Sequence, residues 1–213
     1  MARLSRNAPP ALPIAPPEYT AGYMGQLLNV LRLFFNTLFN FQQQLGGDIG
    51  GSYIRTPYGQ FSNTGTLTFS AADTPQTYSF TQEDYANGMH YEVADGIHVD
   101  NSGLYNYQYS VQLENSAAQE QEVTIWLQVN DVDLPNTASK FGVPLKHGAI
   151  NGYTIAVCNF YVELTGGDHV SLRASTSSTS VVMDAYAAST VPYTRPAVPS
   201  VVATLTFVSA LET

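Results

Sequence analysis

The sequence predicts an all-β head, an antiparallel sandwich of about eight to ten short strands, behind a proline-rich arm and one α-helix. Three observations predict this organisation. Apolar residues recur at every second position through much of residues 58–213, as in strands that bury one face. Residues 21–45 repeat their apolar positions in steps of three and four, and residues 1–20 contain five prolines.

The first segment, residues 1–20, is predicted to be an extended arm. Its prolines are Pro9, Pro10, Pro13, Pro16 and Pro17. Proline lacks the amide donor that helices and sheets need, so this segment has no basis for a core of its own. It is either an unattached tail or an anchoring arm that becomes ordered along the surface of a partner.

Residues 21–45 are predicted to form an apolar docking or oligomerisation helix. A heptad-like stripe contains Met24, Leu28, Leu31, Phe35, Leu38 and Leu45, interrupted by Gln42. A second apolar set, Leu27, Leu33, Phe34, Phe39 and Phe41, widens this side well beyond a narrow seam. A polar stripe through Arg32 keeps every apolar run shorter than a membrane span needs. We therefore expect the helix to be buried against copies of itself or inside a host assembly, through Leu28, Leu31, Phe35 and Leu38.

A glycine-rich linker, residues 46–57, should separate the helix from the head, with Gly46 and Gly47 ending the helix. In the head, residues 58–213, the clearest alternation is in residues 104–113, and residues 123–129 repeat it. Further alternating runs occupy residues 66–70, 76–81, 89–94, 97–100, 155–164, 170–174, 181–185 and 201–207. The dipeptides Asp95-Gly96 and Asn130-Asp131 fit tight turns between strands, and Asp95-Gly96 predicts a hairpin. Many short strands joined by regular turns predict an antiparallel sandwich of the jelly-roll type.

Tyrosine is the most conspicuous side chain of the head. Tyr105, Tyr107 and Tyr109 share one face of a predicted strand, and Tyr153, Tyr161 and Tyr186 follow later. Large amphipathic rings of this kind fill sandwich cores and are also enriched at subunit interfaces. Both roles remain open for Tyr105, Tyr107 and Tyr109, which we take as candidate interface residues.

Composition and charge exclude several classes of protein. The chain has 213 residues, of which 44% are hydrophobic and 12% charged, which argues against a disordered protein. Its net charge of −9 disfavours nucleic acid and anionic membranes as partners. Residues 56–139 contain 11 aspartates and glutamates and neither lysine nor arginine, a pattern that fits a solvated surface better than a binding site. The first residues lack the apolar run of a signal peptide, so we expect synthesis in a cytoplasm.

Motifs for catalysis are lacking in the sequence, and we expect neither enzymatic activity nor a cofactor. The histidines His90, His98, His147 and His169 are scattered without metal-ligand spacing and are expected at the surface or at strand edges. Cys158 alternates with apolar neighbours and is expected to be a small buried hydrophobe. Asp131 and Asp133 are weak candidates for Ca²⁺ ligands, and no other metal site is expected. A polysaccharide depolymerase would need a pair of carboxylates in a groove.

Several segments of the head resemble the tumour-necrosis-factor-like jelly roll, and within it the complement globular heads. Residues 102–113 resemble the Gly-x-Tyr strand of that family, and residues 125–132 its next strand, with Asn130-Asp131 in place of an Asn-Gly turn. Residues 160–172 resemble its leucine, Gly-Asp and valine-strand segment, and residues 200–208 its closing strand. The resemblance covers about residues 58–208 and implies a homotrimer packed through aromatic and apolar faces, without implying a ligand.

The N-terminal segment resembles the start of virion proteins of tailed bacteriophages, especially marine and cyanobacterial ones. The resemblance begins with residues 12–19 and runs into residues 28–36, so it covers a stretch of about 25 residues. It implies a structural protein of a phage particle, made in the host cytoplasm, whose arm and helix (residues 1–45) dock on capsid or tail and portal proteins. The head would act as a capsid decoration or cement protein or as part of a tail fibre. Alternatively, it would bind a glycan or protein of the host surface.

Overall fold

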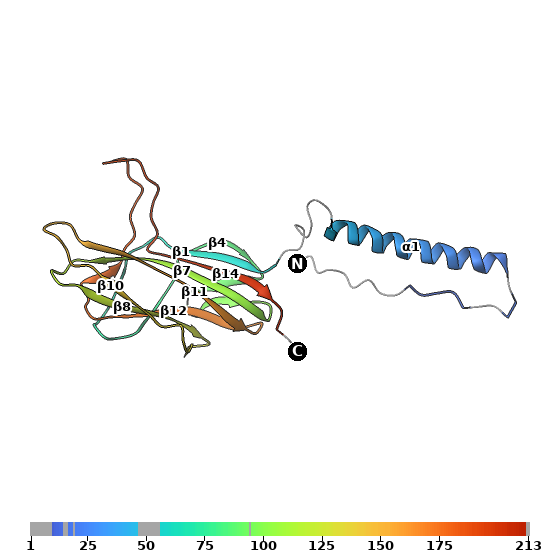
Figure 1. The fold of residues 1–213 in the computed structure, drawn as a ribbon, viewed down its shortest axis with the longest axis horizontal. Helices are drawn as coiled ribbons and strands as arrows, with labels where there is room; N and C mark the ends of the chain where they lie inside the picture. Colours follow the sequence, from blue (N-terminus) through green and yellow to red (C-terminus); the bar gives the residue numbers. More distant parts are fainter. Residues whose placement is uncertain (1–9, 15–16, 19, 47–55, 94, 212–213) are drawn as a thin grey trace. The chain divides into compact units, whose positions relative to one another are not determined.

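The computed structural model describes residues 10–14, 17–18, 20–46, 56–93 and 95–211. Contacts divide the chain into two compact units, residues 1–55 and residues 56–213, and each is described here by itself. The first unit contains the helix α1 and the second contains the β-sandwich (Figure 1). Most of the predicted linker, residues 47–55, lies outside the described residues.

The helix α1 (Ala21–Gly46) confirms the helix that the heptad-like spacing predicts. It begins after Thr20, whose hydroxyl Oγ1 accepts a hydrogen bond from the amide of Tyr23 at 3.2 Å. Residues 10–14, which precede it, form neither helix nor strand. Within the described residues, no helix is both long enough and apolar enough to cross a membrane.

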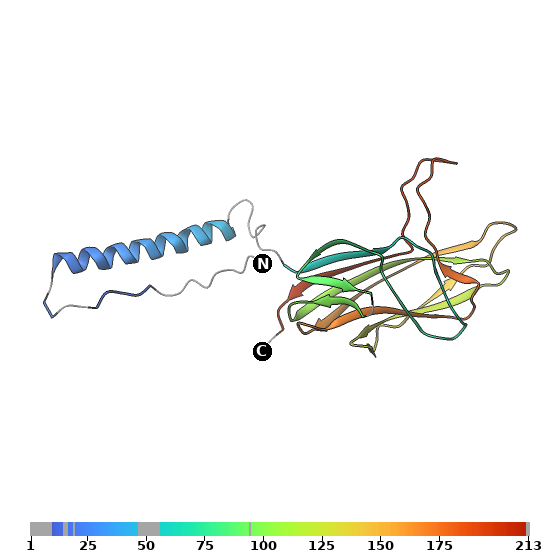
Figure 2. The ribbon, with the colours of Figure 1, turned by 180° about the vertical axis from the view of Figure 1, so that it is seen from behind.

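The head is a sandwich of two antiparallel sheets (Figures 1 and 2). Sheet A contains β1 (Tyr58–Asn63), β2 (Leu67–Thr68), β4 (Gln82–Asn87), β7 (Gly103–Asn115), β11 (Gly152–Leu164), β13 (Val181–Met183) and β14 (Val201–Ser209). Sheet B contains β3 (Gln76–Tyr78), β5 (Met89–Glu92), β6 (Gly96–Val99), β8 (Gln121–Val129), β9 (Val132–Asp133), β10 (Ser139–Val143) and β12 (His169–Thr176).

The chain crosses repeatedly between the two sheets, as in a jelly roll. It passes from β6 in sheet B to β7 in sheet A and back to β8, and later from β10 to β11 to β12. In sheet A, β7 pairs with β11 on one edge and with β13 and β14 on the other. The prediction of an all-β antiparallel jelly-roll sandwich is therefore confirmed. The strands outnumber the predicted ones because β1, β4, β9 and β10 fall outside the alternating runs. Of these, β9 is only two residues long and β4 is exposed over most of its length, so neither shows a buried face.

Two predicted turns have different outcomes. Asn130 and Asp131 have positive φ angles of 49° and 65° and join β8 to β9 in a two-residue hairpin, as predicted. The hairpin assigned to Asp95-Gly96 is displaced, because Gly96 already pairs with Glu92 as the first residue of β6. The turn between β5 and β6 therefore lies before Gly96, and each residue of β5 pairs with an earlier residue of β6 than a turn at Asp95-Gly96 would give.

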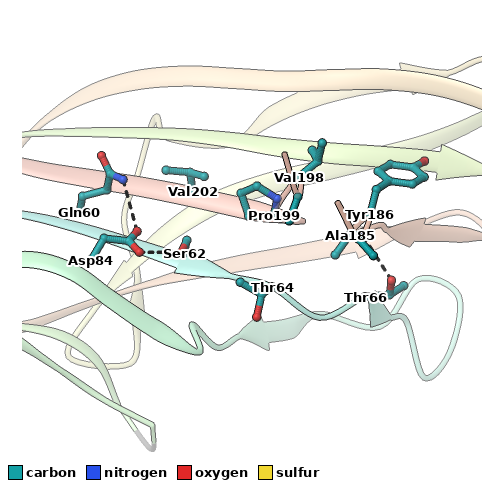
Figure 3. Close-up of a pocket in the computed structure, with 12 residues that line it drawn as sticks. Gln60, Ser62, Thr64, Thr66, Asp84, Ala185, Tyr186, Val198, Pro199 and Val202 are labelled. Carbon is teal, nitrogen blue, oxygen red and sulfur yellow. Dashed lines mark hydrogen bonds between the residues drawn. The ribbon is translucent and has the colours of Figure 1, made fainter. Parts of the chain in front are cut away.

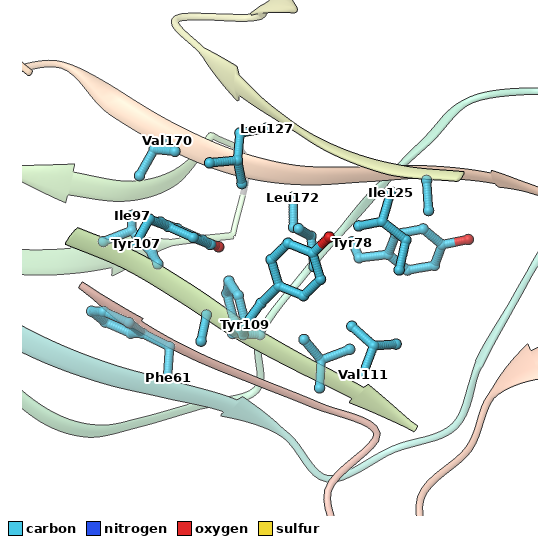
Figure 4. Packing of buried hydrophobic residues seen from close by; sticks show 14 of the residues in the cluster. Phe61, Tyr78, Ile97, Tyr107, Tyr109, Val111, Ile125, Leu127, Val170 and Leu172 are labelled. Carbon is cyan, nitrogen blue, oxygen red and sulfur yellow. The ribbon is translucent and has the colours of Figure 1, made fainter. Parts of the chain in front are cut away.

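The core lies between the sheets and is built from the inward faces of the alternating strands. Figure 4 shows Tyr107 and Tyr109 of β7 packed among Ile125, Leu127 and Leu172 of sheet B. Burial raises the pKa of the Tyr105 hydroxyl to about 12, and it raises the pKa values of Tyr78, Tyr107 and Tyr109 as well. Cys158 is half-buried and packs against this core instead of being fully enclosed.

Candidate functional site

The outer face of β11 exposes a stripe of apolar and aromatic side chains at alternate positions. Tyr153, Ile155, Val157 and Tyr161 form this stripe, called the β11 stripe below, and each is between 53% and 66% exposed. The opposite face of the same strand places Ala156, Val162 and Leu164 in the core. Asn159, which is also exposed, interrupts the stripe between Val157 and Tyr161. An exposed apolar strip of this kind on a folded surface is typical of a protein–protein contact.

The neighbouring strand is polar on the same outer face, which isolates the β11 stripe. Gln112 of β7 lies opposite Ile155, Ser110 lies opposite Val157, and Asn106 lies opposite Tyr161. A polar border around an apolar centre is the usual composition of a subunit interface. We therefore take the β11 stripe as the candidate interface of the head.

Tyr105, Tyr107 and Tyr109, the interface candidates from the sequence, lie in the core. All three are at most 2% exposed in a single protomer, so no second copy can reach them. Tyr105 donates a hydrogen bond to the carbonyl of Asn101 at 2.7 Å, whereas the hydroxyl of Tyr107 is buried without a partner. Of the two roles open from the sequence, the core role is correct for these residues and the interface role is wrong.

The helical candidates divide between two overlapping seams of α1. Leu31 and Leu38 are half-buried, whereas Leu28 and Phe35 are exposed. A second seam, also spaced in steps of three and four, is half-buried throughout; its members are Met24, Leu27, Leu31, Phe34, Leu38 and Phe41. The two seams share Met24, Leu31 and Leu38, so α1 offers a broad apolar face, as helices of bundles do.

A ribbon formed by residues 186–198 projects from the sandwich (Figures 1 and 2). Two grooves border this ribbon. The first groove, of about 510 Å³, contains Gln60, Ser62 and Asp84 at one end and Tyr186 at the other (Figure 3). Asp84 accepts hydrogen bonds from Gln60 Nε2 at 3.3 Å and from Ser62 Oγ at 3.2 Å. Among the described residues that line this groove, Asp84 is the one carboxylate.

The second groove, of about 550 Å³, lies between the 186–198 ribbon and the β11 stripe. Tyr153, Ile155, Tyr186, Tyr193 and Arg195 contribute to its lining. The Tyr186 hydroxyl donates a hydrogen bond to Glu114 Oε2 at 2.7 Å, and the guanidinium of Arg195 lies 5.5 Å from the centre of the Tyr186 ring. Burial and the bond to Glu114 raise the pKa of Tyr186. This groove continues the apolar surface of β11 toward the ribbon.

Asp131 and Asp133, the weak Ca²⁺ candidates, bind different partners. Asp133 Oδ1 accepts hydrogen bonds from Trp126 Nε1 at 2.7 Å and from Gln128 Nε2 at 2.8 Å, which hold its pKa below the ordinary value. Asp131 Oδ1 lies 3.7 Å from His169 Nε2. The structure therefore gives no support to a shared Ca²⁺ site at this pair.

Three of the four histidines form a row across the outer face of sheet B. His90 of β5 lies directly opposite His98 of β6, which in turn lies opposite His169 of β12. The His90 and His98 rings stack with centres 5.3 Å apart, and the His98 and His169 rings are 5.2 Å apart. The expectation of scattered histidines is thus wrong for these three. A two-residue turn at Asp95-Gly96 would place His90 opposite a residue later than His98. The predicted turn therefore gives the wrong register and hides the His90–His98 pair.

Comparison with known proteins leaves the function to be argued from this geometry. No protein-family model matches the chain, and no curated protein matches its sequence.

Proposed function

We propose that this chain is a non-enzymatic structural protein that forms a homotrimer. Its jelly-roll heads pack through the β11 stripe, and its helices join through the shared seam residues Leu31 and Leu38. The observation that carries the proposal is the β11 stripe, an apolar strip on a head whose own core is already complete. The helix α1 adds a second apolar surface, with Leu28 and Phe35 exposed to a neighbour.

The location we propose is a phage particle, with residues 1–45 as the attachment segment. Support comes from the resemblance of residues 12–19 and 28–36 to virion proteins and from the proline-rich arm. Three arms on one trimer bind together far more strongly than one, because each later arm binds at a high effective concentration. The head then serves as a decoration or cement protein on the capsid, or as a tail or fibre component.

The β11 stripe is tested with a matched pair of valines in the isolated head, residues 56–213. This unit contains the complete hydrophobic core, so it is expected to fold alone. Val157 of β11 is 60% exposed in sheet A and Val132 of β9 is 69% exposed in sheet B. We expect Val157→Glu to convert the head to a monomer in light scattering, because three buried carboxylates would meet an apolar contact. Val132→Glu should leave a trimer. Equal masses for the two variants would contradict the proposed interface.

The alternative function is adhesion to a host-surface glycan or protein, and the first groove favours it. Gln60, Ser62 and Asp84 form a polar cluster at one end of this groove and the Tyr186 ring lies at the other, so a sugar chain along the groove could hydrogen-bond at one end and stack at the other. A glycan array with the full-length protein tests this alternative. Selective binding that Asp84→Asn abolishes, and that Glu83→Gln on the same strand retains, would favour adhesion.

Particles that lack the head would separate the two functions. Loss of a cement protein leaves fragile particles, whereas loss of an adhesion module leaves intact particles that do not adsorb to the host. If purified particles contain none of this chain, the virion proposal fails.

A further inference from the structure

The end of the β5–β6 hairpin gathers a mixed set of nitrogen and oxygen donors. Donor atoms of Glu92, Asp95 and His98 lie within 4.8 Å of one another, the one such group of three in the part of the chain that the structure describes. His98 Nε2 lies 3.8 Å from Asp95 Oδ2 and 4.0 Å from Glu92 Oε2. This convergence follows from the register, because Glu92 pairs with Gly96, which has no side chain to separate Glu92 from His98.

The buried nitrogen of His98 is a second and independent observation. The His98 side chain is only 17% exposed, and its Nε2 atom is buried without a hydrogen-bond partner. A buried polar atom without a partner is unfavourable in a folded protein, and a bound metal ion would satisfy it. This atom points toward the two carboxylates, which are themselves about half exposed and free to adjust.

His90 completes the surroundings of the cluster from the neighbouring strand. Its ring stacks on His98 with an angle of 12° between the planes, and its Nε2 lies 3.4 Å from Glu92 Oε1. One oxygen of Glu92 therefore faces His90 and the other faces His98. An outer imidazole that orients a carboxylate ligand in this way is typical of metal sites.

We propose that Glu92, Asp95 and His98 bind a divalent transition-metal ion of the Zn²⁺ type, with His90 orienting Glu92. The donor set of one imidazole and two carboxylates fits Zn²⁺, whereas Ca²⁺ and Mg²⁺ prefer oxygen donors alone. Tetrahedral Zn²⁺ sites place ligand atoms roughly 3.4 Å apart, so the donor atoms, which lie within 4.8 Å of one another, must draw closer together when the ion binds. The fourth position is open to water. This site is independent of the proposed trimer and would tie the β5–β6 turn to its own strands.

The test is a calorimetric titration of ZnCl₂ into the full-length protein after treatment with a chelator. We expect one Zn²⁺ per chain, and about tenfold or greater weakening in His98→Gln and in Asp95→Asn. His147→Gln is the matched control, because His147 is an exposed imidazole outside the row, and it should leave the affinity unchanged. His169→Gln should also leave it unchanged, because His169 Nε2 faces Asp131 instead.

A second measurement guards against variants that fail to fold. Zn²⁺ should raise the melting temperature of the wild type and of His147→Gln but not that of Asp95→Asn, whose unligated melting temperature should match the wild type. The proposal is overturned if the wild type binds no Zn²⁺ or if His147→Gln weakens binding as much as His98→Gln. It is also overturned if an excess of Ca²⁺ displaces the Zn²⁺.

Discussion

Tyr105 and Tyr107 have similar surroundings but differ in one hydrogen bond. Both rings are fully buried on the inner face of β7. The Tyr105 hydroxyl donates to the Asn101 carbonyl, whereas the Tyr107 hydroxyl is buried with no partner. A buried hydroxyl with a hydrogen-bond partner contributes to stability. A buried hydroxyl without a partner lowers stability, because its lost hydrogen bonds to water are not replaced.

This difference predicts opposite effects for the same substitution at the two positions. Tyr105→Phe should lower the free energy of unfolding by about 1 kcal/mol, because it removes a formed hydrogen bond. Tyr107→Phe should leave it unchanged or raise it by up to about 1 kcal/mol, because it removes an unsatisfied group. Urea denaturation of the two variants measures both values. A larger loss for Tyr107→Phe than for Tyr105→Phe would refute this description of the core.

The sequence predicts residue roles only where one face of a strand is clearly apolar. In β7 the tyrosines alternate with Asn106 and Gln108, so their burial follows from the pattern. In β11 the alternation through Ala156 and Val162 identifies the inner face, but the outer face is largely apolar too, and the pattern does not predict a role for the exposed Tyr153, Val157 and Tyr161. The His90–His98–His169 row depends on cross-strand register, which a shift of one or two residues in a predicted turn destroys.

Among the elements, α1 shows how an apolar repeat can contain two seams. Met24, Leu31 and Leu38 belong to both seams. The seam with Leu28 and Phe35 reaches the polar Gln42, whereas the seam with Leu27 and Phe34 continues to Phe41. The helix itself follows from the spacing and from the Thr20 cap. Which seam meets a neighbour depends on that neighbour, so the spacing alone leaves it open.

A pair of leucines tests the shared seam. Leu31→Ser should weaken assembly of the full-length chain by about 2 kcal/mol per protomer, because a leucine side chain of a shared seam is lost from the contact. Leu33 belongs to neither seam and is exposed, so Leu33→Ser is the matched control. Sedimentation over a range of concentrations measures the dissociation of each variant. If Leu33→Ser is the more damaging substitution, the helix packs through a different face.

At the scale of the whole molecule, the chain divides into a helical unit and a head. The contribution of each unit to oligomer formation can therefore be measured separately. The long strands β7, β8, β11 and β14 carry the alternation that predicts the sandwich, and the proline-rich and heptad-like segments predict the two N-terminal parts. We propose that the partners of the exposed β11 stripe and of α1 are other copies of the chain, whose positions the alternation within one chain does not predict. Oligomeric state is therefore the property on which the proposed function depends.

The solution mass of the full-length chain and of residues 56–213, measured by light scattering, tests this claim most directly. We expect a trimer in both cases, with a full-length mass of about three times 23.1 kDa. A trimer only at full length would assign assembly to α1 and remove the β11 stripe from the interface. Monomers in both samples would contradict the proposed homotrimer.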